Sequence, residues 1–414
     1  MPSDAQPGGG GGDKVNLRNP EVMKLVQDQV QTHYRSRLVE YARYSGQPLR
    51  GGDITVRLAK AFGFCYGVER AIDLAYAAAK VFQGRSIYLL GEIIHNPEVN
   101  DQLRAMGIHS LKEGREGYDL SGLNERDVVI IPAFGAELKV MDRLKQIGCQ
   151  TVDTTCGDVM SVWKRVRQYS REHVTSIIHG KAWHEETKAT SSRTLTPDGR
   201  SHYLVVFNLE ETDYVCRYIR DGGDKRAFLE KFKGCHSDGF DPDEHLKRVG
   251  VANQTTMLRG ETEEVQRRIQ AAIRDRYGER GLGEHFRFFD TICGATQERQ
   301  DALELMLKDP LDLLLVVGGY NSSNTSHLAE MGEAVLPTYF IKNAEKLISP
   351  QEISHYDQHK GQEVFSRDWL PSGAITVGVT AGASCPNNLI EETIRRLFEL
   401  RGIDIYQAIP GILE

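Results

Sequence analysis

A short segment that contains a cysteine occurs three times in the chain, each time where an expected strand passes into an expected helix. Residues 152–157 read VDTTCG, residues 289–294 read FDTICG, and residues 62–67, FGFCYG, share the glycine turn that follows the cysteine. The simplest geometry consistent with this repetition is three similar α/β modules, each of which presents one cysteine at a strand-to-helix turn.

The pattern between these segments supports the same architecture. After Gly51 and Gly52, short apolar runs alternate with amphipathic helical stretches. The expected strands are residues 54–58, 87–90, 128–131, 175–178, 203–206, 313–317 and 375–379, and the expected helices include 68–80, 159–166 and 389–398. Such alternation predicts βαβ units, and several runs are too apolar for a sheet with one face in water. The expected fold class is therefore α/β, with small, mainly parallel sheets in three similar modules.

The length of 414 residues agrees with more than one domain. We expect a tail and an appended helix over residues 1–53 and modules over residues 54–155, 156–292 and 293–414. The first dozen residues, rich in glycine, are expected to form a flexible tail. Apolar spacing from Val22 to Tyr41 predicts one helix, capped by Asn19 and ended before Gly46. Residues 210–248 are dense in charge and glycine and are interpreted as an insertion in the second module.

Composition excludes several classes of protein. The net charge of −7 argues against a dominant role in binding polyanions. The longest apolar runs are far shorter than the roughly 20 residues that span a bilayer. The N-terminus has the features of neither a secretory signal nor a transit peptide. Seven cysteines, an odd number, indicate a reducing compartment such as the cytoplasm rather than a disulfide framework.

Three cysteines, Cys65, Cys156 and Cys293, occupy the repeated turns. A thiolate at a helix N-terminus is expected to have a lowered pKa and to be a good metal ligand. CxxC pairs are absent, so such ligands have to come together by folding. Three thiolates on a cluster of four irons leave one iron open to a substrate oxygen. The residues alone leave open whether these cysteines share a metal site or are buried thiols. The remaining cysteines are interpreted as small buried apolar residues: Cys149, Cys216, Cys235 and Cys385.

Two polar turns suit an anion. Residues 321–327, NSSNTSH, follow an apolar strand and precede a helix expected to begin near Leu328, and residues 381–387, AGASCPN, repeat the arrangement with Pro386 in the first helical turn. Hydroxyl, amide and backbone N–H groups at a helix N-terminus bind anions, although the same residues are also ordinary N-caps.

Histidine and threonine side chains follow other expected strands. His95 comes after the strand at 87–90, and His179, His184 and Glu186 come after the strand at 175–178. A histidine near a phosphate supplies a donor, and a glutamate beside it can relay a proton, although each residue alone also fits a structural role. The segment 251–258 supplies two hydroxyls that can orient a substrate hydroxyl, those of Thr255 and Thr256.

Taken together, these motifs resemble the 4-hydroxy-3-methylbut-2-enyl diphosphate reductase family, the last enzyme of the non-mevalonate route to isoprenoid precursors. The resemblance runs from about Ile54 to Phe398 through GFCYGVERAI, EIIHNP, DTTC, HGKAWHEET, NQTTML, DTICGATQERQ, NSSNTSHL and TAGAS, in that order. The N-terminal helix and the insertion are similar to the longer branch of the family, known from cyanobacteria and plant plastids.

The resemblance implies a fold, a cofactor and roles for residues. Three modules are expected to surround a 4Fe–4S cluster with pseudo-threefold symmetry, and one iron is expected to lack a protein ligand. Cluster ligands would be Cys65, Cys156 and Cys293. Diphosphate contacts would be His95, His184, Ser322, Ser323, Asn324 and Ser384. Glu186 would be the proton source, and Thr255 would contact the substrate near its hydroxyl.

The implied reaction is a two-electron reductive dehydroxylation that yields isopentenyl and dimethylallyl diphosphate. A ferredoxin or flavodoxin is expected as the electron donor, in the bacterial cytoplasm or, for a processed plant-type protein, in the plastid stroma. Phe134 stands where the short form of the family has a histidine, as in the longer branch, so we assign it no diphosphate contact. Gly157 stands where a proline commonly follows the second cluster cysteine.

Three other functions remain open from the residues alone. A hydro-lyase would use the open iron as a Lewis acid and consume no electrons, so dependence on a reductant distinguishes it. A redox sensor with a labile cluster would have no need of two Ser/Asn turns, so diphosphate binding distinguishes it. An α/β enzyme without metal is distinguished by the iron content of anaerobically purified protein.

Overall fold

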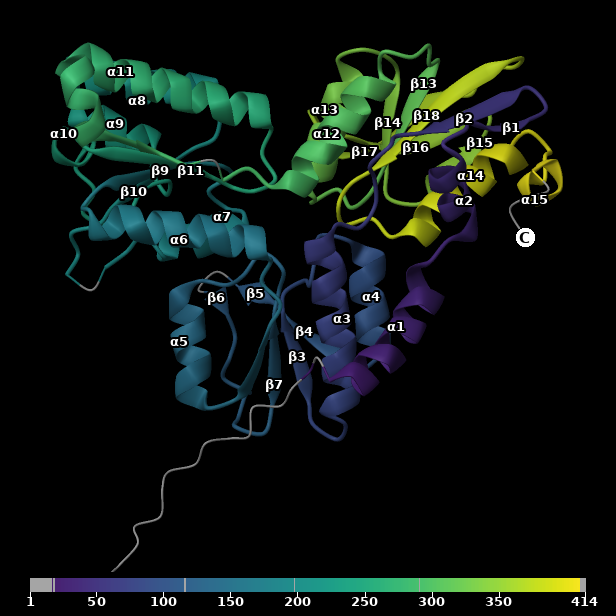
Figure 1. Cartoon of the computed structure of the whole chain (residues 1–414), viewed down its shortest axis with the longest axis horizontal. Helices are drawn as coiled ribbons and strands as arrows, with labels where there is room; N and C mark the ends of the chain where they lie inside the picture. Colours follow the sequence, from purple (N-terminus) through teal and green to yellow (C-terminus); the bar gives the residue numbers. More distant parts are fainter. Residues whose placement is uncertain (1–16, 18, 115–116, 197, 290, 410–414) are drawn as a thin grey trace, which may run out of the picture.

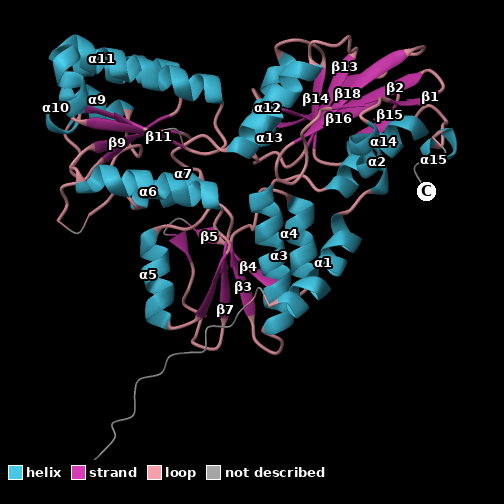
Figure 2. Cartoon of the chain, viewed as in Figure 1, coloured by secondary structure: helices cyan, strands magenta, loops and turns pink. Residues whose placement is uncertain are grey.

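Three small sheets, each flanked by helices, meet around the centre of the molecule in the computed structural model (Figure 1). The structure describes residues 17, 19–114, 117–196, 198–289 and 291–409. The expected flexible tail, the first dozen residues, lies outside the described residues. Every module combines helices with strands, as Figure 2 shows, which confirms the α/β class.

The first module contains a four-stranded sheet that is parallel throughout. Its strand order is β4-β3-β7-β8, with β3 at Ile87–Leu90, β4 at Ile108–Leu111, β7 at Val128–Ile131 and β8 at Gln150–Asp153. Every residue of β7 is buried. The helices of this module are α3 (Tyr66–Val81), α4 (Pro97–Ala105) and α5 (Leu138–Ile147), and β5 (Glu113–Gly114) and β6 (Gly117–Tyr118) form a short hairpin.

The second module repeats the arrangement, again with parallel pairing throughout. Its strand order is β10-β9-β11-β12, with β9 at Thr175–His179, β10 at Tyr203–Val206, β11 at Val249–Asn253 and β12 at Phe286–Phe288. Its helices are α6 (Gly157–Arg171), α7 (Glu185–Ser192), α8 (Leu209–Asp221), α9 (Lys225–Lys231), α10 (Pro242–His245) and α11 (Arg259–His285).

The segment interpreted as an insertion forms α8, α9 and α10 and is part of the core of this module. Helix α8 packs along α11. Cys216, Phe228 and Phe232 are buried in the same apolar cluster as Val249 and Val251 of β11. The dense charge of the segment lies on the outer faces of these helices, which is why its buried positions are hard to recognise in the sequence.

The third module has a five-stranded sheet in the order β1-β2-β18-β13-β14. Its strands are β1 (Leu49–Gly51), β2 (Ile54–Leu58), β13 (Leu313–Val317), β14 (Thr338–Ile341) and β18 (Ile375–Ala381), and only the β1–β2 pair is antiparallel. Its helices are α12 (Gly294–Met306), α13 (Ser323–Glu333), α14 (Asn387–Glu399) and α15 (Ile405–Ala408), together with the 3-10 turn η1 (Ala344–Lys346).

The expected start of the first module at residue 54 was wrong. Strand β2 pairs in parallel with β18, Ile54 beside Ile375, and Val56 is buried in the core of the third module. The chain therefore passes through the sheet of the third module at β1 and β2 and crosses into the first module between β2 and α3, where Cys65 lies. An apolar run in the sequence predicts a strand, but which strand it pairs with depends on how distant parts of the chain pack together.

The N-terminal segment forms two helices instead of the single helix expected. Asn19 caps α1 (Pro20–Tyr34), as predicted, but the helix ends at Arg35, and Ser36 caps a second helix, α2 (Arg37–Ser45), by accepting a hydrogen bond from the Val39 N–H. Helix α1 packs on α3 of the first module, whereas α2 packs on α14 of the third. The break lets one segment contact two modules.

An antiparallel sheet in the third module was missed. It comprises β15 (Leu347–Ser349), β16 (Glu352–Asp357) and β17 (Gln362–Arg367). No residue of β17 is buried, so this strand lacks the continuous apolar run by which the others were recognised. All seven expected strands are present.

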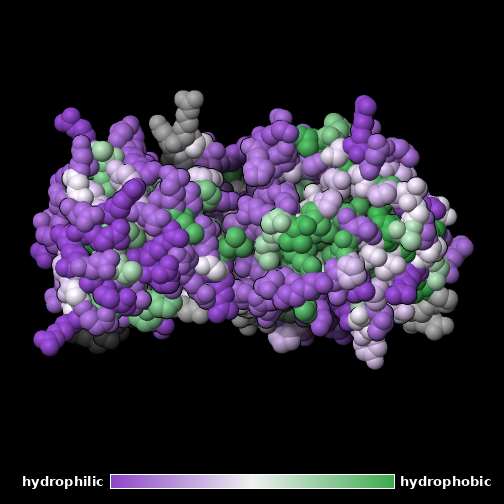
Figure 3. Space-filling model, turned by 90° about the horizontal axis from the view of Figure 1, so that it is seen from above, coloured by the Kyte–Doolittle hydropathy of each residue, from purple (hydrophilic) through white to green (hydrophobic). Residues whose placement is uncertain are grey.

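The surface differs between modules. Seen from above, as in Figure 3, hydrophilic residues dominate over the second module, while apolar residues gather nearer the third. Among the described residues, no helix has both the length and the apolar character needed to cross a membrane.

Candidate active site

One pocket lies where the three modules meet, and side chains from all three line it. Counting the space at its open mouth, it holds about 710 Å³. Every residue singled out by the family resemblance as a ligand, contact or proton source lines it: Cys65, His95, Cys156, His184, Glu186, Thr255, Cys293, Ser322, Ser323, Asn324 and Ser384.

The three cysteines have equivalent positions in the fold. Cys65, Cys156 and Cys293 are the N-cap residues of α3, α6 and α12, so each thiol lies at the start of a helix, as the repeated turn predicted. The expectation that their pKa values fall was wrong for two of them. Burial raises the pKa of Cys156 to about 11 and that of Cys293 to about 12, outweighing backbone hydrogen bonds that lower both. Loss of hydration therefore dominates over the helix terminus.

The space around these thiols fits a bound metal cluster. Gly67, in the first turn of α3, faces Cys156: a Cβ placed on Gly67 would come within 2.5 Å of its Sγ and 3.9 Å of the Sγ of Cys65. Only a residue without a side chain leaves room there. Three thiols from different modules share one pocket, and burial favours the neutral forms of Cys156 and Cys293 while no cation is bound. Such thiols suit an iron–sulfur cluster or another soft metal as ligands.

A buried arginine that the sequence reading did not single out supports the first cysteine. Arg299 of α12 is buried and donates to the Gly63 carbonyl from Nε at 3.1 Å and from Nη2 at 2.6 Å, and to the Phe64 carbonyl at 3.0 Å. It thereby ties the third module to the loop that carries Cys65. Arg299 lies within the motif DTICGATQERQ, and this was the only sequence feature that pointed to it.

His184 has a defined neutral form. It caps α7, and its Nδ1 accepts a hydrogen bond from the Glu186 N–H at 3.1 Å. Burial lowers the pKa of His184 well below its usual value, and the neighbouring His95 adds to the effect. A neutral imidazole whose Nδ1 accepts carries its proton on Nε2. That Nε2 is buried and has no hydrogen-bond partner in the described part of the chain, so it can donate to a ligand.

His95 is held by contacts on its face and its edge. The ring of Phe134 stacks on it with centroids 4.7 Å apart and planes 9° apart, and the His184 ring meets it edge-on at 5.0 Å. The Nδ1 of His95 lies 3.1 Å from Oε2 of Glu92, which also accepts from Nδ2 of Asn321 at 2.8 Å. Phe134 thus lines the pocket as a support for His95, not as a polar contact.

A carboxylate that follows His184 lies beside both imidazoles. Glu185 Oε2 is 3.7 Å from Nε2 of His95 and 3.9 Å from Nδ1 of His184. Ligand atoms of these three residues lie within 4.8 Å of one another, a spacing compatible with a metal ion. The thiols are the better candidates for a resident cofactor, because they are equivalent by position and come from three modules.

Glu186 is the most perturbed carboxyl group of the pocket. It is buried, and Thr255 donates to it twice, from the backbone N–H to Oε1 at 2.6 Å and from Oγ1 to Oε2 at 2.9 Å. Burial raises the pKa of Glu186 to about 7, although both hydrogen bonds oppose the rise. A carboxyl group of this kind can hold a proton near neutral pH and release it to a bound ligand.

The serine and asparagine turns meet on the side of the third module. Helix α13 begins at Ser323, earlier than the expected start near Leu328, because Ser322 is its N-cap. Asn324 accepts a hydrogen bond from the Ala383 N–H at 2.8 Å, and Ser384 Oγ lies 3.3 Å from Ser322 Oγ. The amide Nδ2 of Asn324 is buried without a partner. The earlier helix start brings first-turn N–H groups and these side chains together, an arrangement of donors that suits an anion.

Two further differences concern the neighbouring positions. Pro386 is the N-cap of α14, which begins at Asn387, so it precedes the first helical turn. His179 does not line the pocket; its Nδ1 lies 2.9 Å from Thr262 Oγ1. Thr256 does line it.

Gln254 is a second residue that the sequence reading missed. Its Oε1 accepts from the Lys181 N–H at 3.1 Å and from Thr187 Oγ1 at 3.2 Å, and its Nε2 donates to Ser323 Oγ at 3.2 Å. It therefore connects the second module to the serine turn of the third. Its position next to Thr255 in the NQTTML motif was the available signal.

The remaining cysteines lie away from the pocket. None of them lines it, and Cys149, Cys216 and Cys385 are buried while Cys235 is partly exposed. Burial strongly raises the pKa of Cys385, whose thiol lies 3.7 Å from the Pro386 carbonyl oxygen. Its neighbour Ser384 faces the pocket, so adjacent residues point to opposite sides of the turn.

Comparisons with known proteins agree with this geometry. The LytB protein family matches residues 56–398. The chain is 51% identical over 383 residues to a 4-hydroxy-3-methylbut-2-enyl diphosphate reductase of Gloeobacter violaceus, covering 91% of this chain and 90% of that protein. It is 48% identical over 379 residues to the enzyme of the same name from Thermosynechococcus vestitus, covering 91% of this chain and 92% of that protein.

Solved structures show a similar fold. The structure of (E)-4-hydroxy-3-methyl-but-2-enyl diphosphate reductase, the terminal enzyme of the non-mevalonate pathway, aligns with a TM-score of 0.51 at 26% identity and covers 83% of this chain and 99% of that chain. The corresponding reductase from Plasmodium falciparum aligns with a TM-score of 0.61 at 21% identity over 84% of this chain and 88% of that chain.

Proposed function

The chain belongs to the LytB protein family, and on that basis we propose that it is a 4-hydroxy-3-methylbut-2-enyl diphosphate reductase, acting in the terminal step of the non-mevalonate isoprenoid pathway. The observation that carries this proposal is the composition of one pocket. Three thiols at helix N-termini, a buried carboxyl group and a set of hydroxyl, amide and imidazole donors all face the same space.

The proposed cofactor is an iron–sulfur cluster held by Cys65, Cys156 and Cys293. We propose specifically a 4Fe–4S cluster in which one iron has no protein ligand. When bound, such a cluster supplies single electrons and an open coordination position for a substrate oxygen.

The donors of the pocket are proposed to bind the diphosphate. Nε2 of His184 carries the proton in the neutral imidazole, and both it and the buried Nδ2 of Asn324 lack a hydrogen-bond partner among the residues that the structure describes. A buried donor without an acceptor destabilises the empty pocket, because it has lost its hydrogen bonds to water. A ligand that accepts its hydrogen bond removes this cost. Phosphate oxygens are suitable acceptors, and Ser322, Ser323, Ser384 and His95 complete the proposed set of contacts.

Glu186 is proposed to supply a proton to the departing hydroxyl group. Its carboxyl group lies in the same pocket, and its pKa of about 7 means that a large fraction is protonated at neutral pH. The Thr255 hydroxyl, bonded to Glu186, is proposed to lie beside the substrate hydroxyl and to orient it. The modules around the pocket keep bulk water away from the Glu186 carboxyl group, so its proton is transferred to the bound substrate instead of to water.

The overall reaction balances with two electrons and two protons. The allylic C–O bond breaks, the hydroxyl oxygen leaves as water with one proton, and the second proton adds to the carbon skeleton. Protonation at either end of the allylic system gives isopentenyl or dimethylallyl diphosphate. Electrons are proposed to come from a ferredoxin or flavodoxin, in the bacterial cytoplasm or the plastid stroma.

An anaerobic assay tests the proposal. Purified protein with a reconstituted cluster is mixed with 4-hydroxy-3-methylbut-2-enyl diphosphate and methyl viologen reduced by dithionite, and the products are separated by chromatography. We expect both five-carbon diphosphates, formed as the viologen is oxidised in a ratio of two per substrate. Turnover without a reductant would instead identify a hydro-lyase, and absence of diphosphate binding would exclude both.

A further inference from the structure

An exposed aromatic residue covers the junction between two of the three cysteine-bearing helices. Tyr66 follows Cys65 at the start of α3 and is 58% exposed. Its hydroxyl reaches the first residue of α6: a Cβ placed on Gly157 would lie 2.6 Å from that oxygen. The ring therefore spans from the Cys65 helix to the helix that Cys156 caps.

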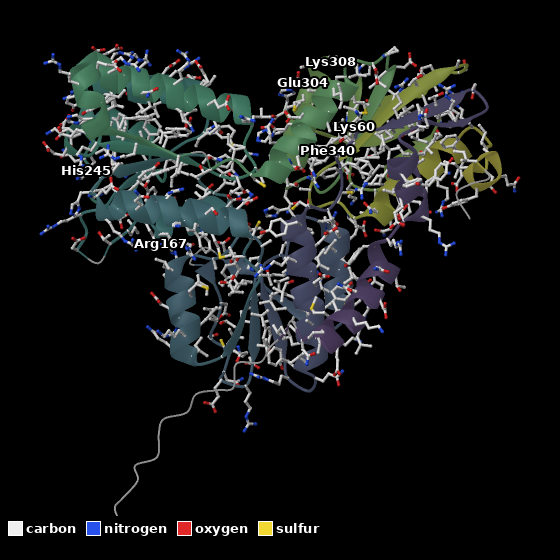
Figure 4. All side chains as sticks on the ribbon, viewed as in Figure 1. Lys60, Arg167, His245, Glu304, Lys308 and Phe340 are labelled. Atoms are coloured by element: carbon white, nitrogen blue, oxygen red, sulfur yellow. The ribbon has the colours of Figure 1, made fainter. Side chains whose placement is uncertain are left out.

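A line of exposed side chains continues from this point along α6. Met160 is 40% exposed, and Lys164, Arg167 and Arg171 are exposed after it. The spacings of four, three and four residues put all four on one face of the helix, the face that also includes Gly157. We call Met160, Lys164, Arg167 and Arg171 the α6 basic stripe; it is about 16 Å long at 1.5 Å per residue. Figure 4 labels Arg167 on this helix.

The stripe has a charge opposite to that of the whole chain. Helix α6 carries four basic residues and a single acidic one, Asp158, which lines the pocket, whereas the net charge of the chain is −7. Within the described residues, Lys164, Arg167 and Arg171 make no ion pair, unlike Arg267 and Arg268 on α11, which pair with Glu264. Three unpaired cations in line on an acidic protein produce a local positive potential along α6, and the first of them lies about 10 Å from the helix start that Cys156 caps.

We propose that the α6 basic stripe, together with Tyr66, is the docking surface for a small acidic protein that delivers single electrons to the site. The inference rests on the proposed function, which consumes electrons that this chain has to receive from another molecule. Tyr66 and Met160 are exposed near the starts of α3 and α6, the two helices that Cys65 and Cys156 cap, so a carrier that covers them lies over the helix starts of two proposed cluster ligands.

The size and charge of the surface suit a transient electron-transfer partner. Such complexes bury less than about 1,200 Å² and rely on electrostatic attraction for fast encounter. The net charge of −7 repels an acidic carrier. At 0.1 M salt, charges farther than about 10 Å from the carrier are largely screened, so a local positive surface can attract the carrier once the two are within that distance. Each turnover consumes two reduced carriers, which give up one electron apiece and leave oxidised.

The test compares two reductants on one charge-reversed variant. The variant is Lys164→Glu/Arg167→Glu/Arg171→Glu. The matched control, Lys24→Glu/Lys80→Glu/Arg280→Glu, reverses three exposed basic residues on α1, the far end of α3 and α11 that form no ion pair with any described residue. Turnover is measured with an acidic 2Fe–2S ferredoxin and with dithionite-reduced methyl viologen, at several salt concentrations.

We expect the stripe variant to raise the KM for ferredoxin at least tenfold and to lose most of its salt dependence, with viologen-driven turnover within twofold of wild type. Lys164→Arg/Arg167→Lys/Arg171→Lys, which keeps the charges, should restore the ferredoxin KM. Equal ferredoxin KM values for the stripe and control variants would overturn the docking assignment.

A binding measurement keeps this inference separate from the proposed function. Calorimetric titration of ferredoxin into each protein requires no turnover. We expect ferredoxin to bind to the wild type and to the control variant, and not to the stripe variant. If wild type binds ferredoxin through the stripe yet reduces no substrate with either reductant, the proposed function fails and the docking surface stands. If ferredoxin binds all three proteins equally, the docking surface fails.

Discussion

Thr255 contacts both carboxylate oxygens of Glu186, with the backbone N–H 2.6 Å from Oε1 and the hydroxyl 2.9 Å from Oε2. The two residues come from different elements, α7 and the turn after β11, and both are buried. Burial raises the pKa of the carboxyl group to about 7, while the contacts from Thr255 limit the rise. The pair therefore holds a proton-exchanging group at a fixed place in the pocket.

Replacing Glu186 by glutamine should remove the proton source without removing the shape of the side chain. We expect Glu186→Gln to lower turnover by about 100-fold or more, the usual contribution of general acid catalysis. Substrate affinity, measured by calorimetry, should change by less than threefold, and iron content should stay the same. Glu261→Gln, which alters a partly buried carboxyl group that does not line the pocket, is the matched control. Near-normal turnover of Glu186→Gln would remove Glu186 from its role.

The pH dependence of turnover should follow the protonated form of Glu186. Because its pKa is raised to about 7, turnover should fall as the pH rises through that value. Thr255→Val removes a hydrogen bond that lowers this pKa, so the falling limb should move to higher pH. Initial rates from pH 5.5 to 9 with a constant reductant check both statements. An unchanged limb in Thr255→Val would assign the titration to another group.

The cysteines should separate into two groups by iron content. Cys65→Ala, Cys156→Ala and Cys293→Ala should each lose most of the iron and acid-labile sulfide of anaerobically prepared protein, because each removes one of the three thiols of the pocket. Cys385→Ala should retain both, since its thiol is buried on the other side of the turn. Full iron content in any of the first three variants would contradict the ligand assignment.

A glycine pair offers a steric test of the same site. Gly67→Ala would place a methyl group 2.5 Å from the Sγ of Cys156, whereas Gly294→Ala, at the start of α12, meets nothing within 4 Å. We expect the first variant to lose the visible absorbance of the cluster and the second to keep it. Circular dichroism should show both folded. Equal absorbance in both variants would mean that the thiols can shift to make room for the methyl group and still bind the cluster.

The stacking of Phe134 on His95 should affect substrate binding more than chemistry. An aromatic pair of this geometry contributes about 0.5–1.5 kcal/mol. Phe134→Leu removes the stack and should raise the KM for the diphosphate substrate by about two- to tenfold, with kcat nearly unchanged. Phe134→Tyr keeps a flat ring and serves as the control. A fall in kcat with an unchanged KM would show that Phe134 acts on the reaction itself.

Local structure was predictable from the sequence where a residue acts through its own neighbours. The apolar runs at 128–131 and 313–317 are strands that are buried throughout, because a parallel sheet covered on both faces needs such a run. Asn19 caps α1 and Gly46 ends α2 in a left-handed conformation, as their types suggest. The break at Arg35 was missed although Ser36, a good N-cap, marked it.

Contacts between modules were not predictable in the same way. The sequence contains no indication that β2 pairs with β18, more than 300 residues later, or that Arg299 reaches the carbonyl oxygens before Cys65. Gln254 likewise connects α7 and α13 only because the modules meet there. Such contacts depend on which surfaces the three modules bury against one another.

The sequence by itself determined that each of the predicted site residues follows a strand or begins a helix, because those positions are set by local patterning, and the family resemblance implied that they share one pocket. Only the tertiary structure decided their electrostatics. Burial between modules raises the pKa of Cys156, Cys293 and Glu186, although a helix N-terminus alone favours the charged form of a thiol. The free energy of a charge depends on the water removed around it, and distant parts of the chain remove that water here.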